Sequence, residues 1–176
     1  PLPPGRRKSI STTCGRSMLA ADVSPNRLQR ARMAVQEFVR RHTNGRVGLV
    51  VGDVTGHGIE ASITAFQAKY LLRVFLKNYR DPAQALEELN MQLSAHDRAE
   101  EFISMCVVVF DPRAGTLRYA SAGHPAMWLW HQRDLQPLRS TGPLITLDPQ
   151  AEYSSREIEL DEGDLVVLYT DGLAEA

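Results

Sequence analysis

Residues 47–58 read VGLVVGDVTGHG, and this stretch determines the fold and the site that we expect. Its first part, 47–51, is a short apolar run that is typical of a buried strand. Asp53 follows that run among glycines 52, 56 and 58, which leave backbone carbonyls and amides open to a ligand. Hard divalent cations such as Mg²⁺ and Mn²⁺ prefer carboxylate and carbonyl oxygens. A glycine-rich turn with a helix-capping aspartate remains the alternative for this segment.

A second segment near the end of the chain repeats the pattern. The apolar run 165–169 leads directly to Thr170, Asp171 and Gly172. By itself this is an ordinary turn at the end of a strand, but two strand-end aspartates would repel each other unless a cation neutralised them. Two metal ions held about 3.5–4 Å apart can lower the pKa of a bridging water and clamp a phosphoryl group. Such chemistry needs no nucleophile from the protein.

The rest of the chain shows helical spacing first and strand alternation later. Residues 1–13 have the composition of a linker or disordered tail and are excluded from the fold. Spacings of three and four predict helices over 24–39, 59–78 and 81–93. A period of two predicts strands over 102–110, 117–121, 126–130, 135–138, 153–160 and 165–169. This order favours an α+β fold with helices packed on antiparallel sheet.

Composition excludes several classes of function. The chain has 176 residues and a formal net charge of -1, so one domain is expected and no overall field attracts nucleic acid or a membrane surface. No apolar stretch approaches the roughly 18 residues that cross a bilayer. Cys14 and Cys106 lie far apart, and Cys106 falls in an apolar run where a free thiol behaves as a small hydrophobe. These features indicate a cytoplasmic protein.

The histidines are weaker candidates for catalysis. His124 lies in a tight turn, SAGHP at 121–125, where we expect it to shape the loop or support the site from behind. His57 could contact a substrate phosphate or simply occupy the turn. The other histidines lack ligand spacing and are expected at the surface. The glycines after 51 resemble a nucleotide-binding loop only superficially, because no Gly-Lys-Ser/Thr follows.

Three segments together resemble one family. GLVVGDVTGHGIEAS (48–62), LRYASAGHPAMWLW (117–130) and GDLVVLYTDGLAEA (163–176) are similar to bacterial PPM/PP2C-type phosphatases of the SpoIIE and RsbU group. The resemblance implies a PP2C-like αββα sandwich, in which two antiparallel sheets are flanked by helices. It assigns residues 14–176 to this domain, which is incomplete at the C-terminus because it is truncated after the Thr-Asp-Gly motif.

The resemblance also implies an activity and partners. Members of this group hydrolyse phosphoserine or phosphothreonine on a regulatory protein, with a water activated by two Mn²⁺ or Mg²⁺ ions. The expected substrate is a phosphorylated anti-sigma-factor antagonist with a STAS domain, whose dephosphorylation regulates a sigma factor by partner switching. A sensor domain upstream in the same chain fits the Pro-rich start, and a homodimer is also considered.

Carried over residue by residue, the resemblance makes Asp53 the carboxylate that bridges both metals. The backbone carbonyl of Val54 becomes a further ligand, and Asp171 becomes a ligand of the second metal. The remaining matched positions shape the loops: Gly52, Gly56, His57, Gly58 and Gly172. No catalytic side chain is expected, since the nucleophile is a metal-bound water.

One upstream motif of the family is not recognisable here. The family carries Gly-Gly-Asp-x-x-Asp before the strand that ends at Asp53, and that register falls on Val35. Glu37 is the nearest carboxylate that could substitute, although it lies in a segment with helical spacing. A catalytically weak pseudophosphatase that binds the same partner is therefore the alternative. An unrelated ATP-binding regulator is a third hypothesis, which only the glycines favour.

Overall fold

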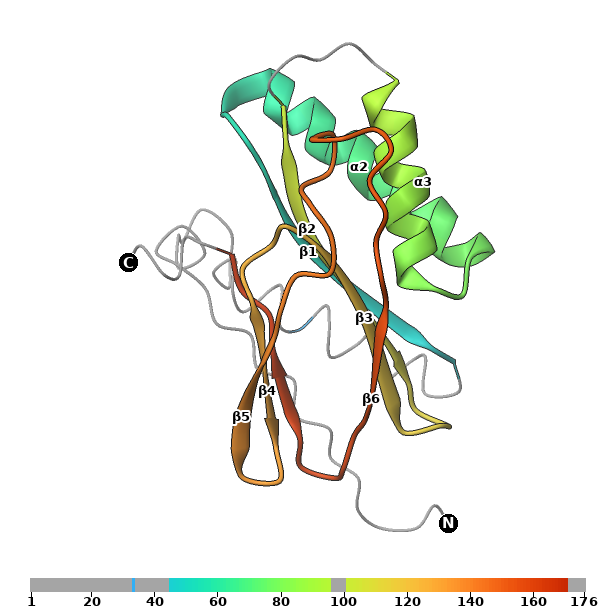
Figure 1. Cartoon of the computed structure of the whole chain (residues 1–176), viewed down its shortest axis with the longest axis vertical. Coiled ribbons are helices and arrows are strands. Elements are labelled where there is room, and N and C mark those ends of the chain that lie inside the picture. Colours follow the sequence, from blue (N-terminus) through green and yellow to red (C-terminus); the bar gives the residue numbers. More distant parts are fainter. Residues whose placement is uncertain (1–32, 34–44, 96–100, 171–176) are drawn as a thin grey trace.

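The computed structural model describes Met33 and residues 45–95 and 101–170. Figure 1 shows the arrangement of the helices and strands of these ranges. In chain order they are β1 (Val47–Val54), α2 (Gly58–Asn78), α3 (Pro82–Ser94), β2 (Ile103–Asp111), β3 (Thr116–Ala122), β4 (Met127–His131), β5 (Asp134–Leu138), β6 (Arg156–Glu159) and β7 (Leu165–Val167).

The strands form two antiparallel sheets. The first sheet has the order β1-β2-β3-β6 and the second has the order β5-β4-β7. β1 and β2 pair along their whole length, from Val47 opposite Phe110 to Val54 opposite Ile103. Because α2 and α3 lie between these two strands in sequence, the pair is a long-range contact rather than a hairpin.

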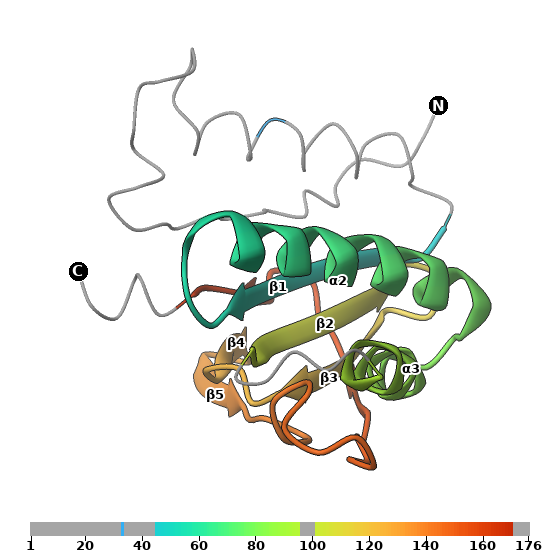
Figure 2. The same cartoon turned by 90° about the horizontal axis from the view of Figure 1, so that it is seen from above.

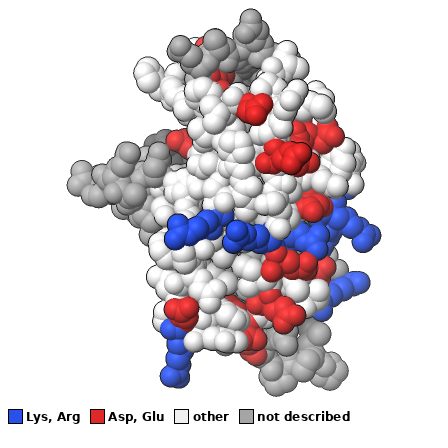
Figure 3. Space-filling view, in the orientation of Figure 1, with Lys and Arg blue, Asp and Glu red and all other residues white. Residues whose placement is uncertain are grey.

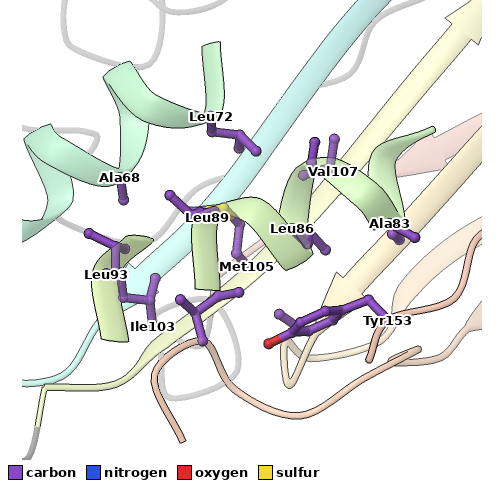
Figure 4. Packing of buried hydrophobic residues seen from close by; sticks show 14 residues of the cluster. Ala68, Leu72, Ala83, Leu86, Leu89, Leu93, Ile103, Met105, Val107 and Tyr153 are labelled. Atoms are coloured by element: carbon purple, nitrogen blue, oxygen red, sulfur yellow. The ribbon is translucent and has the colours of Figure 1, made fainter. Parts of the chain in front are cut away.

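Both helices cover the same face of the first sheet (Figure 2). α3 begins at a cap that the sequence predicts, since the Asp81 side chain accepts a hydrogen bond from the Ala83 amide and Pro82 occupies the first turn. The fully buried Leu86 and Leu89 of α3 lie in one hydrophobic cluster with Met105 and Val107 of β2 (Figure 4). Burying a leucine side chain stabilises a fold by roughly 1.5–3 kcal/mol.

β2 separates two hydrophobic clusters because its side chains alternate between the faces of the sheet. Met105 and Val107 face the helices and belong to the cluster that contains Leu72 and Leu89. Cys106 and Val108 face the other way, toward the second sheet. That second cluster contains Leu117, Tyr119, Met127, Leu129 and Leu138. The described residues thus form three layers: helices, first sheet and second sheet.

The α+β class, the two antiparallel sheets and the order of elements confirm the sequence prediction. In the described residues, helices cover only one of the two sheets. The strand expected over 153–160 is shorter and spans Arg156–Glu159. The tail over 1–13 and the helix over 24–39 lie outside the described residues, apart from Met33, which is helical.

The buried face of α2 is not the most apolar one. Thr64, Ala68 and Leu72 are its buried residues. An apolar stripe on the same helix is exposed and consists of Ile59, Ile63, Phe66, Tyr70 and Val74. An open hollow of about 720 Å³ lies over the first part of this stripe, next to Gly58.

The surface is mixed in charge. On the face in Figure 3, a band of basic side chains is flanked by acidic ones. One pair on the first sheet, Arg118 and Glu157, forms an ion pair with a nitrogen-to-oxygen distance of 2.6 Å. Among the described helices, none combines the length and the apolar character that a membrane span requires.

Candidate active site

Asp53 lies at the carboxyl end of β1 and is exposed. Its neighbour across the sheet is Ser104 of β2. The preceding residue has to be glycine, because a Cβ atom on Gly52 would lie 2.9 Å from the backbone oxygen of Ser104. β1 therefore packs closely against the backbone of β2 at Gly52, while the carboxylate of the next residue, Asp53, is exposed to solvent.

The loop after β1 is fastened to the start of β2. The Thr55 amide donates to the Phe102 carbonyl oxygen at 2.9 Å, and the Phe102 amide donates to Thr55 Oγ1 at the same distance. Gly56 and Gly58 have φ angles of 90° and 87°, in the left-handed region that favours glycine. His57 lies between them as the N-cap of α2, and its side chain makes no capping hydrogen bond.

Six of the predicted site residues thus occupy one strand–loop–helix segment. They are Gly52, Asp53, Val54, Gly56, His57 and Gly58. The other three, Glu37, Asp171 and Gly172, lie outside the described residues. β7 and the residues after it lead toward Asp171, and the last described residue is Thr170.

The turn SAGHP at 121–125 contributes a histidine whose contacts connect the two sheets. His124 follows β3 and is 3% exposed. Its Nδ1 lies 3.0 Å from Ser104 Oγ, and its Nε2 lies 2.9 Å from the carbonyl oxygen of Tyr169. Sequence reasoning identified His124 as a turn residue but missed Ser104 and Tyr169. A polar residue inside the apolar run 102–110 was the available signal for Ser104.

The donor atoms at the end of β1 fit a hard divalent cation. The Asp53 carboxylate and the backbone carbonyl of Val54 are oxygen donors of the kind that Mg²⁺ and Mn²⁺ take. Across the ranges 45–95 and 101–170, no three His, Cys, Asp or Glu side chains gather closely enough to hold a metal.

Comparisons with known structures define the class of the fold. The PP2C phosphatase domain of SpoIIE from Bacillus subtilis superimposes with a TM-score of 0.65 at 18% identity, covering 74% of this chain and 39% of that one. The catalytic domain of the serine/threonine protein phosphatase PstP, in complex with two manganese ions, gives a TM-score of 0.59 at 14% identity. That match covers 73% of this chain and 68% of PstP. The fold is that of the PP2C phosphatases.

The family follows from the sequence. The family model of Stage II sporulation protein E (SpoIIE) matches residues 43–176, and the chain belongs to this family. Phosphoserine phosphatase RsbU of Bacillus subtilis (strain 168) is 28% identical over 131 residues. This match covers 73% of the chain and 39% of RsbU, so the chain spans about two fifths of the length of that relative.

Proposed function

We propose that this chain carries a metal-dependent protein serine/threonine phosphatase activity directed at phosphoserine or phosphothreonine of a regulatory protein. The observation that supports it best is the exposed Asp53 carboxylate at the end of β1, in a domain with the PP2C fold and SpoIIE family membership. The phosphoserine phosphatase activity in the name of RsbU points the same way. Residues 14–176 form the proposed phosphatase domain.

In this proposal Asp53, the carbonyl of Val54 and Asp171 hold two Mn²⁺ or Mg²⁺ ions, and Glu37 is the upstream carboxylate that could complete the set. When bound, such ions stabilise charge on phosphoryl oxygens and lower the pKa of water. The protein's own contribution is positional. The paired contacts of Thr55 and Phe102 fix the loop that follows Asp53, and the amino end of α2 at Gly58 favours the negative charge of a phosphate.

The proposed substrate is a phosphorylated anti-sigma-factor antagonist with a STAS domain, in a partner-switching pathway of the bacterial cytoplasm. Support comes from RsbU and from a structural neighbour that belongs to the bacterial stressosome, which gives a TM-score of 0.55 at 21% identity. A sensor domain upstream in the same protein and a homodimer are part of the proposal.

The second candidate is a pseudophosphatase that binds the phosphoprotein without hydrolysing it. The observation that favours it is the upstream segment, where position 35 is Val rather than the aspartate of the family motif. Loss of one carboxylate would leave a site with too little negative charge for two divalent ions.

The decisive experiment measures Mn²⁺ binding by titration calorimetry together with phosphate release from a phosphoserine STAS protein and from p-nitrophenyl phosphate. Wild type should bind Mn²⁺ and release phosphate only in its presence. Asp53→Asn should abolish both, while Glu162→Gln, which neutralises an exposed carboxylate in the turn before β7, should change neither. If the chain binds the phosphoprotein but shows no Mn²⁺-dependent hydrolysis, the proposed phosphatase activity is refuted and the pseudophosphatase is supported.

A further inference from the structure

His124 occupies the junction between the two sheets, at the edge where Asp53 lies. Ser104, on one side of its ring, belongs to β2 of the first sheet. Tyr169, on the other side, lies just beyond β7 of the second sheet. The ring is buried, with 3% of the residue exposed, so these contacts are shielded from competing water.

The two contacts determine which ring nitrogen carries the proton. A backbone carbonyl can only accept a hydrogen bond, so Nε2 of His124 must donate to the oxygen of Tyr169 at 2.9 Å. In the neutral imidazole Nδ1 is then an acceptor, and the hydroxyl of Ser104 donates to it at 3.0 Å. The neutral Nε2–H tautomer therefore satisfies both partners at once.

Each partner of the His124 ring is a near neighbour, across a strand pair or along the sequence, of one of the two proposed metal-binding aspartates. Ser104 is the residue opposite Asp53 in the β1–β2 pair. Tyr169 lies two residues before Asp171 in sequence. One side chain thus connects the strand pair that carries the first aspartate to the segment that leads to the second.

The backbone that carries His124 is itself held in place. Gly123 has a φ of 59°, which favours glycine, and a Cβ atom there would lie 2.6 Å from a methyl carbon of Leu144. Its amide donates to both Ser140 Oγ at 2.8 Å and the Gly142 carbonyl oxygen at 3.0 Å. The ring therefore projects from a tightly packed turn and has little freedom to follow movements of either partner.

We propose that His124 is a positioning residue that sets the separation between the Asp53 strand end and the segment leading to Asp171, through the linked contacts to Ser104 and Tyr169. This inference rests on the proposed metal-dependent function. His124 acts from behind the site and contacts neither metal nor substrate. Tight binding of two ions requires carboxylates fixed to within a fraction of an ångström, which is what a rigid link between two sheets supplies.

Two substitutions in the full chain separate the contacts. In His124→Gln the amide nitrogen can reach the place of Nε2 and keep the bond to the Tyr169 carbonyl. In His124→Asn the shorter side chain can reach Ser104 only. Leu86→Ala is the control, because it removes a fully buried side chain from the hydrophobic cluster between the helices and the first sheet and so lowers stability.

Two measurements distinguish positioning from simple stabilisation. The Mn²⁺ dissociation constant should rise about tenfold in His124→Asn, less in His124→Gln, and stay unchanged in folded Leu86→Ala. Without metal, hydrogen exchange of the backbone amides over 165–170 should become about tenfold faster in His124→Asn relative to the rest of the chain, whereas the control should speed exchange through global unfolding without a specific effect on this segment. The tautomer itself is visible as a protonated Nε2 in ¹⁵N spectra of the imidazole.

The outcomes are separable from those of the proposed function. Folded His124→Asn with the wild-type Mn²⁺ affinity would overturn the positioning role, and so would unchanged hydrogen exchange. A wild-type chain that binds no Mn²⁺ would overturn the proposed metal-dependent function instead. The exchange measurement needs no metal, so it would still decide whether His124 holds the segment after β7.

Discussion

Nδ1 of His131 lies 2.7 Å from Oδ2 of Asp164, and this contact joins the end of β4 to the turn before β7. The same carboxylate oxygen accepts a hydrogen bond from the Asp161 amide at 2.8 Å. Only 19% of the His131 side chain and 7% of the Asp164 side chain are exposed. The sequence predicts His131 at the surface, and its side chain is half-buried there; the partner Asp164 has no signal in the sequence.

This contact predicts a dependence of stability on pH. The hydrogen bond to Asp164 raises the pKa of His131, the nearby charges of Asp164 and Asp161 raise it further, and burial opposes them. The folded protein therefore binds the imidazole proton more tightly than the unfolded chain does. The stabilisation is fully present below the unfolded pKa of about 6.5 and is lost as the pH rises through the higher folded pKa.

Urea unfolding at pH 6 and pH 8.5 tests this sign. His131→Gln should lower the free energy of unfolding more at pH 6 than at pH 8.5. The control is His57→Gln, which changes an exposed histidine without a capping hydrogen bond and should give no such difference. Equal losses for His131→Gln at the two pH values would contradict the prediction.

The turn that carries His124 should be intolerant of a side chain at Gly123. Gly123→Ala forces a residue with Cβ into a φ of 59° and brings that carbon within 2.8 Å of two side-chain carbons of Leu144. We expect a loss of about 2 kcal/mol or more. Gly163→Ala, at a φ of 98° with nothing within 4 Å, carries the backbone strain alone and should cost about 1 kcal/mol. Equal urea midpoints for the two variants would show that the Leu144 contact is relieved without cost.

The two apolar faces of α2 should differ sharply in their effect on stability. Leu72 is 1% exposed and packs in the cluster between the helices and the first sheet, so Leu72→Ala should cost about 2–5 kcal/mol. Phe66 is 59% exposed, and its ring packs at a tilt of 45° against the ring of Tyr70, with centroids 4.4 Å apart. Phe66→Ala should therefore cost at most about 1 kcal/mol. Thermal unfolding of the chain decides this, and a larger loss for Phe66→Ala would show that another element covers the exposed stripe.

Periodicity in the sequence predicted α2 but not its orientation. The helix carries apolar residues on more than one face, and a spacing of three or four identifies a helix without saying which face meets the sheet. Alternation similarly predicted β2, yet its pairing with β1 could not be assigned, because two helices separate these strands in sequence. Strand pairing over such a distance depends on the packing of α2 and α3, which lies beyond local pattern.

In the candidate site, too, local sequence pattern predicted the residues that are adjacent in sequence but not the contacts between distant segments. Asp53 was predicted because strand, carboxylate and glycines are adjacent in sequence. The contact from His124 to the Tyr169 carbonyl could not be predicted, since a backbone oxygen has no sequence signature and the two residues are brought together only by the meeting of the sheets. Glu37 and Asp171 stay predictions, because they lie outside the described residues.

The thiol of Cys106 should be unreactive toward thiol reagents in the folded protein. Burial raises its pKa to about 12, and its Sγ lies 2.9 Å from Sδ of Met127 between the two sheets. At pH 8 only about one molecule in 10⁴ would then carry the reactive thiolate, and the reagent would also have to enter the core.

The variant Cys14→Ser tests this directly, because the chain has two cysteines and Cys106 is then the only one left. Under native conditions at pH 8 it should not react with an aromatic disulfide reagent over an hour, whereas in concentrated urea it should release one equivalent of thiol at once. At intermediate urea the rate should follow the fraction of open molecules, so that labelling reports the stability of the contact between the sheets. Rapid, complete labelling without denaturant would mean that the second sheet opens readily from the first. The link through His124 could then not be rigid enough to hold two ligand segments in register.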